Sequence, residues 1–276
     1  MRTSKIVMSV AIAFAIVFSL GIISCQKLDR PELVIIPDPP PPPYNPLKTF
    51  LAFENGIIDS GENKLAGAAS NLTYAAGISG QGMQGAANGY LLVAAPGDTL
   101  KNLGSYTVSF WMNSPPAVNA TGIFAISNTK EFWGNLELFL EGYSVDATTA
   151  FLKVHMVNKN VTDKESWTEI KIPNVFGKWS HIGVSYDGTT STIKIYSNGV
   201  SVLTSVIKSG TYGPLAFADA GGMVVGAMQF MTVPSLTTSH GAEPWARNFT
   251  GILDQFRIYN KALSDAELMV LYTTKK

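Results

Sequence analysis

The sequence predicts an all-β protein, a two-sheet antiparallel jelly-roll sandwich that ends in one short helix. Three observations lead to this fold class. Short segments of alternating apolar and polar residues recur along the chain, Asp-Gly and Asn-Gly pairs separate some of them, and only one segment, near the C-terminus, has a clear helix start. Many short strands with turn residues between them are typical of β-sandwiches.

The first part of the chain supplies seven predicted strands. The clearest is 105–112, in which Tyr106, Val108, Phe110 and Met112 share one face because side chains alternate along a strand. The other six are predicted at residues 50–53, 90–93, 123–127, 136–141, 151–157 and 168–172.

A meander of three antiparallel strands is predicted next. Its turns contain Asp187-Gly188 and Asn198-Gly199. Asn-Gly favours a tight hairpin because both central residues of such a turn need positive φ. The strands are placed at residues 179–186, 191–197 and 200–207, and a further strand at 223–227 precedes the last one.

The last predicted strand, residues 251–259, places one acid among apolar side chains. Alternation puts Asp254 on the face of Ile252, Phe256 and Ile258. A carboxylate there is costly unless it is paired, hydrogen-bonded or bound to a metal. Asp254 is therefore the first candidate site residue.

A short helix is predicted after this strand. Ser264 and Glu267, three residues apart, form a capping box, in which each side chain satisfies a free backbone N–H of the first turn. The helix would pack Leu268 and Leu271 back onto the domain.

Several short motifs in this region occur in a characteristic order. They are Gly177-Lys178-Trp179-Ser180-His181, Tyr186-Asp187-Gly188, Ile195-Tyr196-Ser197-Asn198-Gly199, Gly251-Ile252-Leu253-Asp254 and Tyr259-Asn260-Lys261-Ala262-Leu263-Ser264. Together they resemble the laminin-G/pentraxin-like branch of the concanavalin A-like lectin/glucanase superfamily, from about Leu47 to Tyr272. The resemblance implies the fold. It does not imply one activity, because jelly rolls host lectins, adhesins and hydrolases.

The resemblance also implies a structural calcium ion. In similar families an early loop rich in oxygen donors and the aspartate of the final strand often share one Ca²⁺, which prefers six to eight oxygen ligands. Carried over, the side-chain ligands would be Glu54, Asp59 and Asp254. The alternative is a polar turn capped by Asp59, with Asp254 hydrogen-bonded to backbone amides.

Catalytic motifs are weak in this sequence. Retaining glucanases on this fold can use Glu-x-Asp-x-Glu along one strand, but the chain has Phe139 between Glu137 and Glu141. Without the central aspartate, two glutamates on a solvated face are the favoured interpretation, and we predict no enzymatic activity. A G-x-G-x-x-G match at residues 80–85 lacks the following helix that a dinucleotide site needs.

Tryptophans give the best indication of a ligand. Trp111 and Trp179 fall in predicted strands and are assigned to the core, whereas Trp133, Trp167 and Trp245 are placed in loops or at strand edges beside polar neighbours. Sugars stack their C–H faces on such rings, and nearby amides and acids bind their hydroxyls. These three tryptophans are therefore the predicted carbohydrate-binding residues; the alternative is that each merely packs at the rim.

The N-terminus has the pattern of a targeting segment. Arg2 and Lys5 precede an apolar run that ends in Ile22-Ile23-Ser24-Cys25, which resembles a bacterial lipobox. Cys25 is the one cysteine in the chain, so it can serve as acyl acceptor and no internal disulfide can form. The alternative is a membrane-spanning helix of minimal length.

The expected organisation is thus a lipoprotein signal peptide, a tether and one domain, at residues 1–24, 25–46 and 47–276. The tether contains the run Pro39–Pro43, which favours a semi-rigid polyproline II spacer. Lys plus Arg and Asp plus Glu both number 20, and this balance argues against a nucleic-acid partner.

The function predicted from these features is a non-catalytic carbohydrate-binding lipoprotein. It would be held by its lipid anchor on the bacterial outer membrane, where it would bind a glycan at the cell surface. The first alternative is a structural or adhesive lipoprotein with a protein partner, and the second is a glycoside hydrolase. Whether the loop aromatics converge on a groove or lie on separate rims distinguishes the first two.

Overall fold

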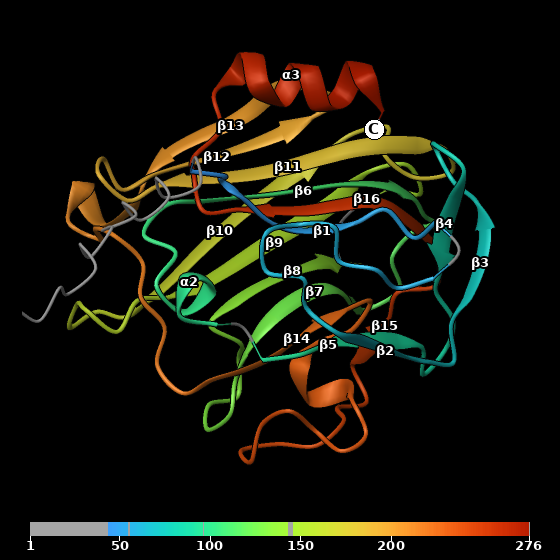
Figure 1. Ribbon diagram of the computed structural model, residues 1–276, viewed down its shortest axis with the longest axis horizontal. Helices are drawn as coiled ribbons and strands as arrows, with labels where there is room; N and C mark the ends of the chain where they lie inside the picture. The colour runs from blue at the N-terminus through green and yellow to red at the C-terminus, as the bar shows by residue number, and fades with distance from the viewer. Residues whose placement is uncertain (1–43, 55, 96, 143–145, 276) are drawn as a thin grey trace, which may run out of the picture. The chain divides into compact units, whose positions relative to one another are not determined.

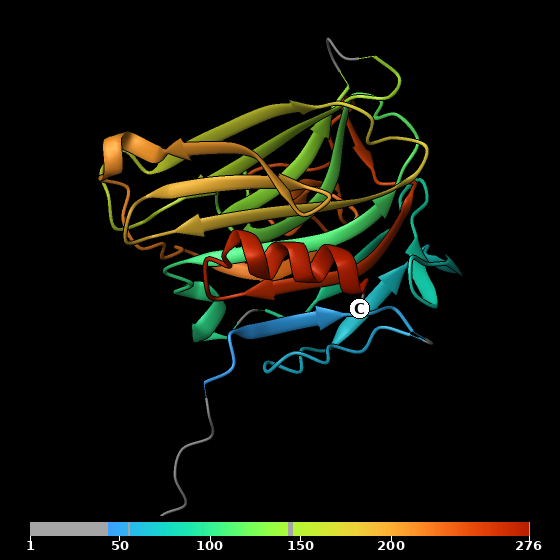
Figure 2. The same ribbon diagram turned by 90° about the horizontal axis from the view of Figure 1, so that it is seen from above.

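A computed structural model describes residues 44–54, 56–95, 97–142 and 146–275. Tyr44–Lys276 is one compact unit. Its layers are two antiparallel β-sheets packed face to face, as the sequence predicts (Figures 1 and 2).

The first sheet, here sheet A, runs in the order β13-β12-β11-β6-β16-β4-β3, with β1 also paired to β16. Its strands are β1 (Leu47–Leu51), β3 (Thr73–Ala76), β4 (Gln81–Gln84), β6 (Tyr106–Asn113), β11 (Trp179–Asp187), β12 (Thr192–Ser197), β13 (Val200–Val206) and β16 (Ile252–Tyr259).

The second sheet, sheet B, runs in the order β10-β9-β8-β7-β14-β5-β2, and β15 pairs with β7 in parallel. Its strands are β2 (Gly67–Ser70), β5 (Tyr90–Val93), β7 (Ala120–Asn128), β8 (Leu136–Glu141), β9 (Ala150–Val157), β10 (Glu165–Ile172), β14 (Ala220–Val225) and β15 (Ala246–Asn248). The helical segments are α2 (Asp98–Lys101), η1 (Ile207–Gly210), η2 (Gln229–Met231) and α3 (Asp265–Thr274).

The core fills the space between the sheets, because the longer strands turn alternate apolar side chains inward. Tyr106, Val108, Phe110 and Met112 of β6 all belong to it, which confirms the predicted face of that strand. Phe256 of β16 packs against Phe110 at 6.2 Å and, across the sandwich, against Phe124 of β7 at 5.1 Å between ring centroids. A truncation in a core of this kind typically costs about 3–5 kcal/mol.

The predicted faces of the last strand are partly wrong. Leu253 is in the core and Asp254 points the other way, because a bulge interrupts the pairing of β16 with β6 between Asp254 and Arg257. Gln255 lies at the bulge with φ of 52°, and its backbone carbonyl accepts from Arg257 Nη1 at 2.8 Å. The extra residue shifts the alternation, so Phe256 and Ile258 still face inward.

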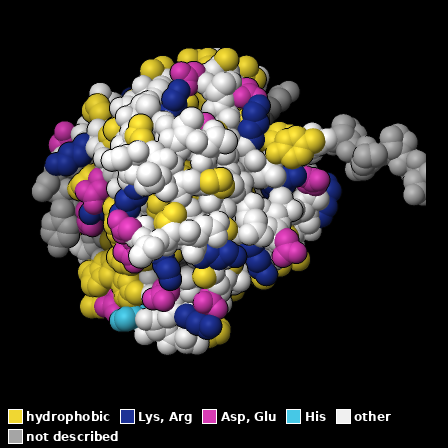
Figure 3. Space-filling view, turned by 90° about the vertical axis from the view of Figure 1, so that its left-hand side faces the viewer, with side chains coloured by type: hydrophobic (Ala, Val, Ile, Leu, Met, Phe, Trp, Pro, Cys, Tyr) yellow, Lys and Arg dark blue, Asp and Glu magenta, His cyan; other side chains and the backbone are white. Residues whose placement is uncertain are grey.

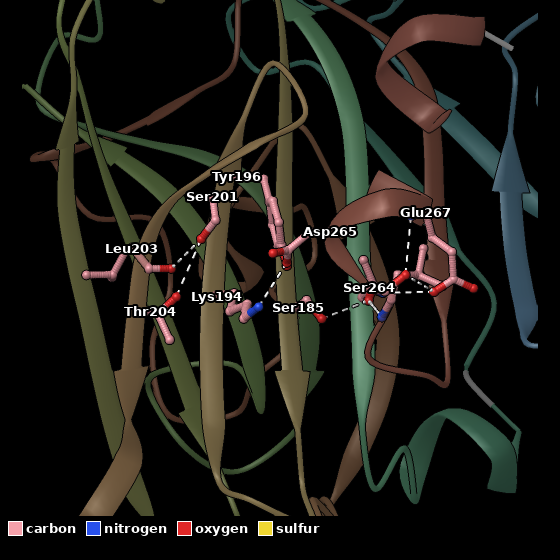
Figure 4. A network of polar contacts seen from close by, with 11 residues as sticks. Ser185, Lys194, Tyr196, Ser201, Leu203, Thr204, Ser264, Asp265 and Glu267 are labelled. Atoms are coloured by element: carbon pink, nitrogen blue, oxygen red, sulfur yellow. Dashed lines mark hydrogen bonds and ion pairs between the residues drawn. The ribbon is translucent and has the colours of Figure 1, made fainter. Parts of the chain in front are cut away.

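Helix α3 lies on the outer face of sheet A (Figure 1). The predicted capping box is confirmed: Ser264 Oγ accepts from the Glu267 N–H at 3.3 Å, and Glu267 Oε2 accepts from the Ser264 N–H at 2.8 Å. Asp265 ties the helix to β12 by accepting from Tyr196 Oη at 2.7 Å and from Lys194 Nζ at 2.9 Å (Figure 4). Beneath the helix, Leu268 is fully buried.

Candidate functional site

An aromatic cluster covers the outer face of sheet B, opposite the core. Leu136, Leu138 and Leu140 of β8 point into the core, so Phe139 points outward. The long segment between β14 and β15 lies over this side of the sheet (Figure 1) and delivers Phe230 and Trp245 to it. The turn between β7 and β8 delivers Trp133.

Trp133 is the centre of this cluster. Its ring stacks on Phe139 at 5.6 Å with 6° between the planes, and it meets Trp167 edge-on at 5.1 Å and Trp245 at 6.0 Å. Trp167 and Trp245 remain 39% and 38% exposed, which is high for such large apolar rings. We call Trp133, Trp167 and Trp245 the tryptophan platform.

Two hollows meet at Trp133. The first, of about 290 Å³, is lined by the platform, Phe139 and the charged residues Glu141, Lys153 and Glu169. The second, of about 460 Å³, lies between the β7–β8 turn and the β9–β10 turn and includes Phe132 and His155. Among the described residues, Trp133 is the one that lines both. On the face in Figure 3, hydrophobic side chains gather next to the visible histidine, with acidic and basic side chains around them.

Buried polar side chains hold the turn that carries Trp133. Glu137 Oε2 accepts from the Gly134 N–H at 3.0 Å, and His155 Nδ1 donates to the Gly134 carbonyl at 3.1 Å. Gln229 Nε2 donates to the carbonyls of Glu131 and Phe132, both at 2.8 Å. Both backbone polar groups of Gly134, the residue after Trp133, are therefore hydrogen-bonded, which holds the Trp133 indole in position.

Burial sets the protonation of this clamp. It raises the pKa of Glu137 to about 7, and it lowers the pKa of His155 to about 4, because the charged form of each is poorly solvated. Both residues are fully buried, and Glu137 Oε1 and His155 Nε2 have no hydrogen-bond partner among the described residues. At neutral pH His155 is therefore uncharged.

The structure brings the three predicted tryptophans together, although each was selected from its own local sequence. Trp167 differs from the prediction in one respect: it lies within β10, on the outward side, rather than outside the strands. Glu137 also differs, since it is buried beneath the turn and not on a solvated face. Arg247, two residues after Trp245 in the sequence, does not line either hollow; it lines a third one of about 490 Å³, whose described wall residues include no aromatic ring.

Several residues of the cluster were missed. No local motif marks these residues, which are Phe132, Phe139, Phe230 and His155. They meet because the β7–β8 turn, β8, β9 and η2 all place side chains on the outer face of sheet B. For Phe139 and His155 the outward alternation of β8 and β9 was a usable indication. For Phe230, in a segment with no strand pattern, the sequence offers none.

The proposed calcium ligands fall into two places. Asp59 is buried and caps a turn: Oδ1 accepts from the Phe50 and Gly61 N–H groups, both at 2.8 Å, and Oδ2 accepts from the Leu65 N–H at 2.9 Å. Among the described residues no three His, Cys, Asp or Glu side chains gather as a metal-binding group. Asp59 thus has a full set of backbone donors without a metal.

Asp254 and Glu54 do approach one another across the loop at residues 77–81. Asp254 accepts from the N–H groups of Ile78 at 2.8 Å, Ser79 at 3.1 Å and Gln255 at 2.6 Å, and Glu54 accepts from the Gln81 N–H at 3.1 Å. Burial, with a smaller contribution from Glu54, raises the pKa of Asp254 to about 6. Backbone N–H groups make all these contacts, and an N–H group cannot ligate a cation as a carbonyl oxygen can. The carboxylates of Asp254 and Glu54 are therefore the groups here that could bind one.

Calcium binding stays a prediction; Glu54 and Asp254 are the carboxylates that lie near each other, whereas Asp59 lies at another turn. A cation between them would relieve their repulsion, and a ligand specific to the native state adds RT ln(1 + [L]/Kd), ~2.7 kcal/mol at a hundred times Kd. We expect a chelator to lower the melting temperature and Asp254→Asn to remove that response. Asp59→Asn is the matched control: it should lower the melting temperature but keep the response to chelator. A wild-type melting temperature indifferent to both calcium and chelator would contradict the prediction.

The predicted signal peptide, lipidation site Cys25 and most of the proline-rich tether lie outside the described residues. Within the described part of the chain, no helix combines the length and the apolar character needed to cross a membrane.

Comparison with known proteins agrees with the architecture. The family model of the concanavalin A-like lectin/glucanases superfamily matches residues 85–269, while no curated protein matches the sequence. Similar solved structures include the receptor binding domain of the botulinum neurotoxin C/D mosaic serotype, with 13% identity and a TM-score of 0.59 over 83% of this chain and 51% of that one.

Two further structures have the same relation to this chain. The binding domain of Paraclostridial Mosquitocidal Protein 1 has 15% identity and a TM-score of 0.59, over 83% of this chain and 52% of that one. A third structure comes from botulinum neurotoxin type C, a toxin whose cell entry is described as dependent on interaction with two ganglioside molecules. It has 13% identity and a TM-score of 0.57, over 83% of this chain and 51% of that one. The chain spans about half the length of these structures, and the likeness concerns the fold. With a family match over most of its length, the chain belongs to the concanavalin A-like lectin/glucanases superfamily.

Proposed function

We propose that this protein is a non-catalytic glycan-binding module. The observation that carries the proposal is the convergence of Trp133, Trp167 and Trp245 around one exposed hollow. Aromatic faces bind the C–H faces of sugars, and the carboxylates and lysine beside them can bind hydroxyl groups. The ganglioside dependence described for the similar neurotoxin supports a glycan as the ligand class.

The surroundings of the glutamates support binding without hydrolysis. A glycosidase needs two carboxyl groups that flank the scissile bond. Here Phe139 stands between Glu137 and Glu141 and is covered by the Trp133 ring, and Glu137 is buried and capped by the Gly134 amide. A sugar on the platform would meet Glu141 but not Glu137.

A glycan-array screen of the purified protein, followed by calorimetric titration of each hit, tests this proposal. We expect at least one hit whose binding depends on the platform tryptophans. A protein partner is the other outcome: another similar neurotoxin binding domain was solved with rat synaptotagmin II, and the exposed indoles could serve a protein equally well. If no glycan binds, an adhesive function with a protein partner is the better proposal. If a bound glycan is hydrolysed and Glu137→Gln abolishes that hydrolysis, the protein is an enzyme.

We also propose that the module is held at the bacterial outer membrane through Cys25. The support is the lipobox-like Ile22-Ile23-Ser24-Cys25 after an apolar run, with no other cysteine in the chain. We expect Cys25→Ala to abolish incorporation of labelled acyl chains in a bacterial host, whereas Ser19→Ala leaves it intact. Labelling that persists in Cys25→Ala would exclude lipidation at this residue.

A further inference from the structure

The third hollow, of about 490 Å³, is separate from the tryptophan platform. None of the described residues in its wall lines either of the hollows at Trp133. It lies beside β15, where that strand joins sheet B by pairing with β7. Its volume falls within the ~300–1,000 Å³ of small-molecule sites, so it has room for a ligand of its own.

One tight turn presents the charged groups of this hollow. The Ala246 N–H donates to the Glu243 carbonyl at 3.1 Å, which closes a turn with Pro244 at its second position, a favoured place for proline. Arg247 Nη1 donates to the carbonyls of Pro244 and Ala246, both at 2.7 Å, so the guanidinium is held against the turn. Among the described wall residues, Glu243 and Arg247 are the charged ones.

These two charges do not neutralise each other by direct contact. Neither Glu243 nor Arg247 takes part in any ion pair among the described residues. Arg247 uses Nη1 to hold its own turn, and a guanidinium has further N–H donors on Nη2 and Nε. Because a guanidinium can bind a carboxylate through two parallel hydrogen bonds, the Arg247 side of the hollow suits a ligand carboxylate.

The hydroxyl groups of the wall favour a ligand that donates hydrogen bonds. Ser114 Oγ donates to the Pro115 carbonyl at 2.8 Å, and Thr121 Oγ1 donates to the Val118 carbonyl at 3.3 Å. A hydroxyl has one proton, so each of these oxygens is left as an acceptor. An ammonium group carries three donors and no acceptor, and it also complements the carboxylate of Glu243.

Apolar side chains form part of the same wall, among them Pro115, Val118 and Met231. Apolar groups of a ligand would be removed from water against them. We propose that the third hollow binds a short apolar peptide with free ends, whose carboxylate contacts Arg247 and whose ammonium group contacts Glu243. This site goes beyond the proposed glycan-binding function and uses other residues.

The test titrates the purified protein with leucyl-leucine and with its N-acetylated, C-amidated and doubly blocked forms. We expect the free dipeptide to bind most tightly and each single block to weaken binding about tenfold, because each block removes one charge-assisted contact. Glycyl-glycine keeps both charges but has no apolar side chain, so it should bind at least about tenfold more weakly than leucyl-leucine.

Variants assign each ligand charge to its residue. Arg247→Gln should weaken binding of the free dipeptide about tenfold and leave binding of the C-amidated form unchanged, and Glu243→Gln should do the same with the N-acetylated form. Lys178→Gln is the matched control and should change neither affinity. Lys178 is exposed and follows Gly177, whose N–H donates to the Ser114 carbonyl, but it is not part of the wall.

Three results would overturn the proposal. The first is equal binding of free and doubly blocked dipeptides, a comparison that needs no substituted protein. The second is no binding of the free dipeptide. The third is an equal loss of the free and the C-amidated forms in Arg247→Gln, since the arginine would then act by supporting its turn. Each of these results leaves the glycan-binding function standing, because that function depends on Trp133 and its neighbours.

Discussion

Trp133→Ala is expected to lower the affinity for a glycan by about thirtyfold, the largest effect of any single substitution on binding. Trp133 lines both hollows and also holds Trp167 and Trp245 in contact. Its loss removes a stacking surface and loosens the other two rings. Truncation of a central aromatic at a binding hot spot typically costs about 2 kcal/mol or more, which corresponds to about thirtyfold in Kd.

Trp167→Ala and Trp245→Ala should each lower the affinity by about tenfold, because each ring contributes to one hollow. Tyr74→Ala is the matched control: Tyr74 is an aromatic of similar exposure, 41%, in β3 of the other sheet. Calorimetric titration of one glycan against these variants gives the result, with circular dichroism to show that each is folded. Unchanged affinity in all three tryptophan variants would exclude the platform as the site.

Glu137→Gln is expected to stabilise the protein at pH 8 by up to about 3 kcal/mol and to have little effect at pH 4.5. The pKa of Glu137 is raised from 4.5 to about 7 in the fold. A raised carboxyl pKa means that the folded state binds the proton more tightly than the unfolded chain does. Stability from this group is therefore present at low pH and is lost as pH rises from about 4.5 to about 7. Each pH unit in this window removes up to ~1.4 kcal/mol from the free energy of unfolding.

Glutamine stays neutral throughout, so the gain over wild type should grow across that pH window. Urea unfolding of both proteins between pH 4.5 and pH 8 measures it. His155 and His181 act in the opposite sense, since their pKa values are lowered to about 4 and stability is lost as pH falls below about 6.5. Both proteins contain these histidines, so the difference isolates Glu137. An equal stability difference at both pH values would contradict a buried, proton-binding Glu137.

Much of the fold follows from local pattern. Strand β6 was predicted with the right inward face because its alternation is unbroken over eight residues. The hairpin was predicted from Asn198-Gly199, and both residues do adopt positive φ, 51° and 77°. The strands that were missed, β2, β3, β4 and β15, have three or four residues each, and Gly and Ala make up half or more of β2 and β3. Their pairing with stronger neighbours, rather than their own propensity, makes them strands.

The site was predictable in its residue types and not in its geometry. Exposed tryptophans in polar surroundings indicated a ligand, but their convergence depends on tertiary placement of the β7–β8 turn, β10 and the segment before β15. The predicted face of Asp254 was wrong for a local reason. The bulge at Gln255 changes which side chains face the core, and a single residue at positive φ is not evident from alternation alone.

The most direct measurement of the platform is the NMR response of the tryptophan side chains. The chain has 5 tryptophans, so a two-dimensional spectrum of the purified protein should give one indole N–H signal for each. Titration with a neutral oligosaccharide should shift the signals of Trp133, Trp167 and Trp245. The signals of Trp111, which is buried against Tyr272, and of Trp179 should stay in place. Saturable shifts confined to Trp111 and Trp179, or no shift with any glycan that binds, would contradict a glycan site at the platform.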